Sequence, residues 1–164
     1  MTPDRADQSR DTRATIESMH AAIAAGGLTA QLPFFADPSR NHGFEVSREQ
    51  LGAVLEDIER TFPDVALELL DLAIDGEVAI GRYAMTGTHL GTQQLPFVHG
   101  GVLHRRPPTN RRFRTEHAHV FRVQGGHIVT HDAVQDNLEL ARQLGVLPAP
   151  GRSSTPDPDL AGRA

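Results

Sequence analysis

The chain of 164 residues contains no cysteine and no lysine, so all 16 of its basic residues are arginine. Without cysteine there is no thiolate nucleophile and no disulfide. Without lysine, no side-chain amine can form a Schiff base with a carbonyl substrate. No serine stands in a G-x-S-x-G segment, and the glycine patterns of dinucleotide and P-loop sites do not occur. Carboxylates, nine histidines and the arginines remain as candidate reactive groups.

The composition predicts one soluble globular domain. Hydrophobic residues make up 38% of the chain, and no stretch approaches the ~20 apolar residues that a membrane helix needs. The polar N-terminus lacks the apolar segment of a secretory signal, so we expect a cytoplasmic protein. Five arginines flank Pro107 and Pro108, but the net charge of -5 favours a solvated turn over a nucleic-acid site. We expect a disordered N-terminal tail, one domain and a disordered C-terminal tail, over residues 1–11, 12–147 and 148–164.

Two helices are predicted in the first part of the chain. Asp11 can cap a helix with an apolar face, which two glycines at 26 and 27 would end. Ser47 and Gln50 have the spacing of a capping box, and apolar residues at helical spacing follow until Pro63. The second of these helices has the clearer pattern.

The remainder of the chain is typical of antiparallel strands. Residues 65–75 and 77–89 alternate like two strands of a hairpin around Asp75-Gly76, and a second pair of strands surrounds Gly125-Gly126. A short helix should then end at Gly145. The sequence therefore predicts an α+β domain with helices on one face of an antiparallel sheet. In the strand RFRTEHAHVFRV, the alternation places five side chains on one face: Thr115, His117, His119, Phe121 and Val123.

The histidine pair of that strand allows two interpretations. His117 and His119, two positions apart, could converge on a metal ion. No glutamate follows in HVFRVQGG to complete a set of three ligands, so we expect no metal. A polar pocket wall, formed with Phe121, is the better interpretation.

Three further residues each have a structural and a functional interpretation. Arg82 interrupts an apolar strand, so it could bind a substrate carboxylate or pair with a neighbouring acid. Asn41 and His42 could contact substrate oxygens or simply form a turn. The pattern alone favours neither interpretation.

Two aspartates stand four positions apart where the last strand gives way to the last helix. Asp136 is placed to act as the N-cap of NLELARQLG, and it could equally serve as a general base. Asp132 lies within the preceding strand. Spacing alone leaves capping and catalysis about equally favoured for Asp136.

Several segments in this order resemble the SnoaL-like polyketide cyclases and their ester cyclase relatives, which belong to the nuclear transport factor two-like superfamily. The resemblance covers roughly residues 14 to 148 and rests on FADPSRNHG, ERTFPD, GRYAMTGTHLG, PPTNRRF, HVFRVQGGHIVTH and QDNLELARQLGVLP. It implies a curved sheet and a few helices that form a cone around a pocket. It also implies that the domain needs no cofactor.

The best-known members of this family close the last ring of aromatic polyketides by an intramolecular aldol step. Their H-W-x-x-x-D segment supplies an aspartate as acid or base. His131 matches the histidine and Asp136 the aspartate, whereas Asp132 stands at the tryptophan position. The resemblance therefore implies that Asp136 is the base. Independently of the family, an aldol closure also needs an acid or a hydrogen bond for the developing oxyanion, which His119 could supply. Asp132 and His131 would then contact the substrate.

The residues and the resemblance together predict a cofactor-independent cyclase in secondary metabolism, such as antibiotic biosynthesis. Its substrate would be a polyketide-like small molecule, and it would form a homodimer or a higher homo-oligomer. The alternatives are an isomerase, a dehydratase or a hydroxylation-assisting enzyme in the same pocket, or a non-catalytic binding module. Fold does not decide among these functions.

Overall fold

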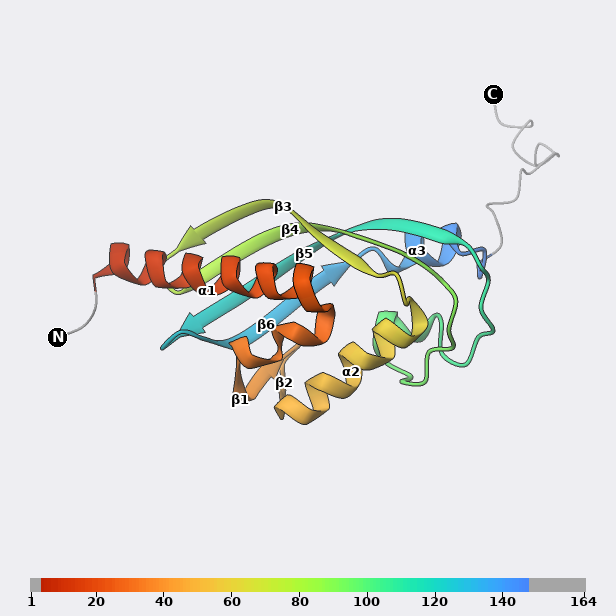
Figure 1. Ribbon diagram of the computed structural model, residues 1–164, viewed down its shortest axis with the longest axis horizontal. Coiled ribbons are helices and arrows are strands. Elements are labelled where there is room, and N and C mark those ends of the chain that lie inside the picture. Colours follow the sequence, from red (N-terminus) through yellow and green to blue (C-terminus); the bar gives the residue numbers. More distant parts are fainter. Residues whose placement is uncertain (1–3, 148–164) are drawn as a thin grey trace, which may run out of the picture.

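The computed structural model describes residues 4–147, in which helices cover one side of a curved sheet (Figure 1). In chain order the elements are α1 (Arg5–Gly26), η1 (Leu28–Phe34), β1 (Phe35–Asn41), β2 (Phe44–Val46), α2 (Arg48–Thr61), β3 (Ala66–Asp75), β4 (Val78–Thr88), η2 (Val98–Gly101), β5 (Arg112–Gln124), β6 (His127–Gln135) and α3 (Asn137–Gln143).

The six strands form one sheet in the order β2-β1-β6-β5-β4-β3. All neighbouring strands are antiparallel except β1 and β6, which are parallel. The predicted α+β class is confirmed, but the sheet is mixed rather than purely antiparallel. Strand β1 has the sequence FADPSRN, whose proline and polar residues lack the alternation of a strand, so no local pattern predicts it.

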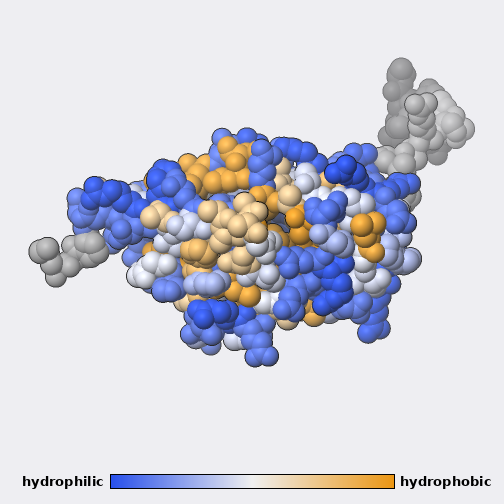
Figure 2. Space-filling model, viewed as in Figure 1, coloured by the Kyte–Doolittle hydropathy of each residue, from blue (hydrophilic) through white to orange (hydrophobic). Residues whose placement is uncertain are grey.

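The face of the sheet that packs against α1 is here called the inner face, and the opposite face the outer face. The largest core cluster joins α1, α2 and the inner face, with Ile16, Met19, Leu55 and Tyr83 among its buried members. A smaller cluster around Phe62, Phe113 and Leu140 lies near α3. Figure 2 shows hydrophilic side chains over the N-terminal end of α1 and apolar ones along β3, which is an edge strand.

Helix α1 begins earlier than the sequence predicts. It starts at Arg5, so the expected disordered tail over residues 1–11 is wrong for residues 5–11. This first part of the helix is held by the β3–β4 turn: Arg5 pairs with Asp75, and the backbone N–H of Gly76 donates to Ser9 Oγ at 2.9 Å. The predicted C-terminal tail, residues 148–164, lies outside the described residues.

The other predicted elements agree with the structure. The capping box is present at the start of α2, where Ser47 Oγ accepts from the Gln50 N–H and the Gln50 side chain accepts from the Ser47 N–H. Strands β3 and β4 form the expected hairpin, and Gly145 follows α3 with a positive φ of 71°. Within residues 4–147, no helix is long and apolar enough to cross a membrane.

Candidate active site

A group of histidines lies on the inner face, where β4, β5 and β6 run side by side. The pairing of these strands sets Tyr83 opposite His117, and Phe121 opposite His131. Because side chains alternate along a strand, these residues and His119 point to the same face. The predicted alternation of β5 is confirmed: Thr115, His117, Phe121 and Val123 are buried, whereas Glu116, Ala118, Val120 and Arg122 are exposed.

His119 and His131 form a hydrogen-bonded pair at the centre of this group. His119 Nδ1 lies 2.9 Å from His131 Nε2, so one ring donates and the other accepts. The outward nitrogens, His119 Nε2 and His131 Nδ1, are buried and have no hydrogen-bond partner in the described part of the chain. If both rings adopt the other neutral tautomer, so that His131 Nε2 donates to His119 Nδ1, His119 Nε2 becomes a donor and His131 Nδ1 an acceptor.

Helix α1 brings a second polar pair to the same place. His20 Nε2 lies 2.8 Å from the hydroxyl oxygen of Tyr83, and the two rings stack with their centroids 5.0 Å apart. The Tyr83 ring in turn meets the His119 ring edge-on at 4.7 Å. A phenol O–H and an imidazole nitrogen therefore lie beside the central histidine pair.

Two more histidines extend the group along the sheet. The ring of His117 stacks on His119 with a centroid distance of 5.8 Å, and its Nε2 lies 3.2 Å from Thr115 Oγ1. The ring of His42 lies 5.7 Å from that of His131, and the His42 backbone N–H donates to the His131 carbonyl at 3.0 Å. Residues far apart in the sequence thus form one continuous set of rings.

Burial keeps the imidazoles of His117, His119 and His131 in their neutral form. Desolvation, followed by the nearby His131 and other histidines, lowers the pKa of His119 to about 2. Desolvation followed by His42 lowers the pKa of His131 to about 3, and desolvation alone lowers that of His117 to about 4. Burial also raises the pKa of Tyr83 above its ordinary value. Near neutral pH the group therefore contains uncharged donors and acceptors.

Neither of the two predicted aspartates makes a hydrogen bond to the histidines, although Asp136 lines a hollow together with His117. Asp136 is exposed and is the N-cap of α3, where its carboxylate accepts from the Glu139 N–H at 2.8 Å. Asp132 is exposed and lies opposite Val120 on the outer face. The residue of β6 that lies opposite His119 is Ala133. The structure therefore does not bring Asp136 and His119 together, and the hydrogen bond shows the capping role of Asp136. Its catalytic role stays a prediction.

Arg82 also faces away from the histidines. Its guanidinium donates to Asp71 and to Glu116 at 2.7 Å each, on the outer face. The structure shows the alternative expected for Arg82, pairing with neighbouring acids, and its substrate-binding role stays a prediction. Asn41 ends β1 and His42 begins the tight turn that follows, with a φ of 49°. The structure brings both Asn41 and His42 to the histidine group, because Asn41 pairs with His131 in the sheet and the His42 ring contacts that of His131.

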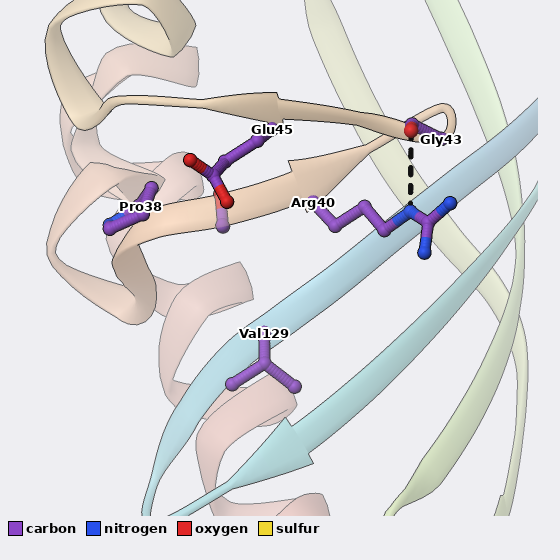
Figure 3. A pocket seen from close by; sticks show the side chains of 6 residues that line it. Pro38, Arg40, Gly43, Glu45 and Val129 are labelled. Atoms are coloured by element: carbon purple, nitrogen blue, oxygen red, sulfur yellow. Dashed lines mark hydrogen bonds between the residues drawn. The ribbon is translucent and has the colours of Figure 1, made fainter.

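Two open hollows lie on the surface of the described residues, and the second includes His117 of the histidine group. The first, with a volume of about 350 Å³, follows the β1–β2 hairpin and includes Val129 of β6. Figure 3 shows Arg40 beside it, with its Nε donating to the Gly43 carbonyl at 3.3 Å. The second, of about 460 Å³, is lined by Arg82, Glu116, His117, Ala118, Val134, Gln135 and Asp136. Most of its lining residues belong to the outer face.

Sequence reasoning missed His20 and Tyr83 as members of the site. His20 stands among the apolar positions of α1, together with Ile16 and Met19, and this polar residue on a buried face was the available signal. Tyr83 is the only tyrosine of the chain. It follows Arg82 on a strand, so the alternation of side chains places the two residues on opposite faces, and this was the available signal.

The curved sheet with its helices on one face places the domain in the nuclear transport factor two-like fold class. The model of the family described as SnoaL-like polyketide cyclase matches residues 15–144, and the chain belongs to this family. A comparison with curated proteins found no match.

Solved structures with the same fold come from several bacteria. TsrD from Streptomyces laurentii is 27% identical, with a TM-score of 0.66, and the match covers 82% of this chain and 98% of that one. IdmH from Streptomyces antibioticus, provisionally described as a polyketide cyclase, is 25% identical, with a TM-score of 0.64 and the same coverages. A provisionally described SnoaL-like polyketide cyclase from Jannaschia is 17% identical, with a TM-score of 0.69 over 90% of this chain and 100% of that one.

Proposed function

We propose that this protein closes a ring in a polyketide-like substrate by an intramolecular aldol reaction and that His119 moves the proton. The observation that carries the proposal is the His119–His131 pair, whose buried outward nitrogens lie beside the Tyr83–His20 pair. The family, which is that of the SnoaL-like polyketide cyclases, supports the class of reaction. Side-chain acid and base groups are enough for such a step.

The reaction needs a proton to leave the carbon between two carbonyl groups. Neutral His119 would accept this proton at Nε2, while its Nδ1–H donates to His131. The resulting enolate carbon would attack a second carbonyl carbon of the same substrate, forming the new carbon–carbon bond. The electrons of that C=O bond move to oxygen, which takes up the proton that His119 removed and becomes an alcohol, so that His119 returns to its neutral form. The Tyr83 hydroxyl, a neutral donor, would stabilise this developing oxyanion.

The low pKa of His119, about 2, limits how weakly acidic the carbon can be from which this base takes a proton. A base of low pKa is present in its acceptor form at neutral pH, but it takes a proton only from an already acidic carbon. We therefore propose a substrate whose reacting carbon lies between two carbonyl groups. A developing enolate beside the ring would also favour the imidazolium form and raise the pKa during the reaction.

The proposal can be tested with a hydroxyanthraquinone that carries a β-ketoester side chain, incubated with the protein in D₂O. We expect enzyme-dependent deuterium exchange at the methylene between the carbonyls and then ring closure. Proton NMR measures both. Exchange without closure would support the proton transfer and reject the cyclisation. Neither exchange nor closure would contradict the proposed function.

We also propose that the protein forms a homodimer through the outer face. Exposed apolar side chains gather there: Val134 is 76% exposed, and Ile80 and Val120 are also accessible. The Arg82 ion pairs with Asp71 and Glu116 border this surface. Such a patch on the surface of a protein is typical of an interface.

Val134→Glu should convert the dimer to a monomer, because a carboxylate would be buried in the centre of the interface. Phe44→Glu is the matched control, since Phe44 is equally exposed but lies on β2 at the other edge of the sheet. Light scattering after size-exclusion chromatography gives the mass of each variant. A monomeric wild-type protein, or a dimer that survives Val134→Glu, would reject this interface.

A further inference from the structure

The segment between β4 and β5 contains a buried histidine with a left-handed backbone. His99 lies in η2, is only 5% exposed, and has a left-handed backbone with a φ of 49°. Its ring meets that of Phe62 edge-on at 5.6 Å. Neither of its ring nitrogens has a hydrogen-bond partner in the described part of the chain.

The segment that carries His99 is firmly attached to the rest of the domain. The buried carboxylate of Asp57 accepts from the backbone N–H groups of Gln94 and Leu95, both at 3.0 Å. The side chain of Gln93 donates to the carbonyls of Leu95 and Val98. His99 is therefore held in its buried position by contacts that do not involve its own ring nitrogens.

The His99 ring, like the buried histidines of the sheet, is neutral because burial lowers its pKa. Burial, followed by the charge that nearby His117 would carry, lowers the pKa of His99 to about 4, while the Gln135 side chain and the Asp57 carboxylate partly oppose this shift. Its imidazole is therefore neutral near pH 7, and it offers one donor and one acceptor. Its recorded ring contact is with Phe62, at the end of α2, and it lies near enough to His117 of β5 for a charge on one ring to act on the other.

The burial of the His99 ring and its left-handed backbone are both expected to lower the stability of the fold. A buried polar group without a partner is rare and destabilising, and a left-handed conformation adds strain in a residue other than glycine. A phenylalanine would make the same contact with Phe62 without the two unpaired nitrogens. Features that combine such costs are found most often at functional sites.

We propose that His99 is a substrate-binding residue whose neutral imidazole hydrogen-bonds an oxygen of an uncharged part of the substrate. The inference rests on the proposed function, because it extends the same site. Within the described residues, the ring and hydrogen-bond contacts of His99, His117, His119 and His131 are with Tyr, Thr, Phe or other His, and the further groups that act on the pKa of His99 are the Gln135 amide and the Asp57 carboxylate. No arginine is among them, so a substrate carboxylate would have no cationic partner here. Carbonyl and hydroxyl oxygens are the groups that fit.

The test uses two related probes: danthron, an uncharged dihydroxyanthraquinone, and rhein, which is the same molecule with a carboxylate. Binding is measured by equilibrium dialysis, and the imidazole resonances are followed by ¹⁵N NMR. We expect danthron to bind, to shift the His99 resonances, and to bind about tenfold more tightly than rhein, since an unpaired buried carboxylate is costly. Equal or tighter binding of rhein would overturn the inference of an uncharged ligand.

Variants separate a binding role from a structural one. His99→Phe should lower the affinity for danthron about tenfold while the Tm stays unchanged or rises, because two unpaired buried nitrogens are removed. His99→Asn, which tolerates a left-handed backbone, should also bind weakly. His127→Phe is the control, since His127 is exposed in the β5–β6 hairpin. A lower Tm for His99→Phe with unchanged affinity would show a structural role and overturn the proposal.

The binding measurements do not depend on turnover. The proposed reaction and the proposed role of His99 can therefore be contradicted independently of each other. If danthron binds through His99 but no isotope exchange or ring closure occurs, the proposed reaction is wrong and the binding role of His99 stands. If exchange and closure occur while His99→Phe binds danthron like the wild type, the role of His99 is wrong and the reaction stands. No binding of danthron to the wild-type protein would also reject the role of His99.

Discussion

Replacing His119 with glutamine is expected to lower the rate of isotope exchange and ring closure about 10²- to 10⁴-fold, the range for a lost acid or base group. Glutamine can still hydrogen-bond to His131, so the fold should be retained, but an amide cannot take up the proton. The rate is measured by NMR with the β-ketoester substrate. Circular dichroism shows whether the variant is folded.

Asp136→Asn tests the competing assignment made from the sequence. Asparagine is as good an N-cap as aspartate, so the hydrogen bond to the Glu139 N–H and the stability should be kept. If His119 is the base, this variant should retain most of its activity. A loss of 10² or more in Asp136→Asn, with full activity in His119→Gln, would reverse the assignment and support the catalytic aspartate. If both variants stay active, neither residue is the base.

Acidification is expected to destabilise the fold well above the pH at which carboxylates become protonated. The folded-state pKa values are about 2 for His119, 3 for His131 and 4 for His117 and His99, all below the ordinary 6.5. Between pH 6.5 and about 4, the unfolded chain therefore binds protons that the folded protein does not. The stability from these neutral rings is complete above pH 6.5 and is lost as the pH falls.

The expected effect is large, because each such histidine contributes up to ~1.4 kcal/mol per pH unit and a typical domain has only about 5–15 kcal/mol in total. Urea unfolding at pH 7.5 and pH 5.5 measures it as a lower midpoint at the lower pH. His117→Phe should weaken this dependence, since one of the titrating rings is gone. Equal midpoints at the two pH values in the wild-type protein would show that the histidines are not buried in neutral form.

Local patterns were sufficient to predict much of the fold. The capping box of α2 and the Asp75-Gly76 turn involve residues close in sequence, and the structure contains both. Strand β1 was not predictable in this way, because it is held by pairing with β6, more than 80 residues along the chain. The start of α1 was missed for a similar reason: contacts with Asp75 and Gly76 stabilise residues that no local pattern marks as helical.

The same limit applies to the site. Alternation along β5 correctly placed His117, His119 and Phe121 on one face. It could not show that His20 of α1 would meet Tyr83, which depends on how the helix packs on the sheet. Nor could it show that Arg82 would find acidic partners on two neighbouring strands, leaving the inner face to uncharged rings.

The docking of α1 has a consequence for the order in which the protein folds. Its contacts with the β3–β4 hairpin join residues more than 60 positions apart, as in the hydrogen bond between Thr12 Oγ1 and the Gly76 carbonyl, at 2.8 Å. Such non-local contacts form only after the entropy cost of closing a long loop has been met. The hairpin, whose strands are adjacent in sequence, can form without that cost. Because Tyr83 meets His20 only when α1 has docked, the completed site is a product of a slow, long-range step rather than of local assembly.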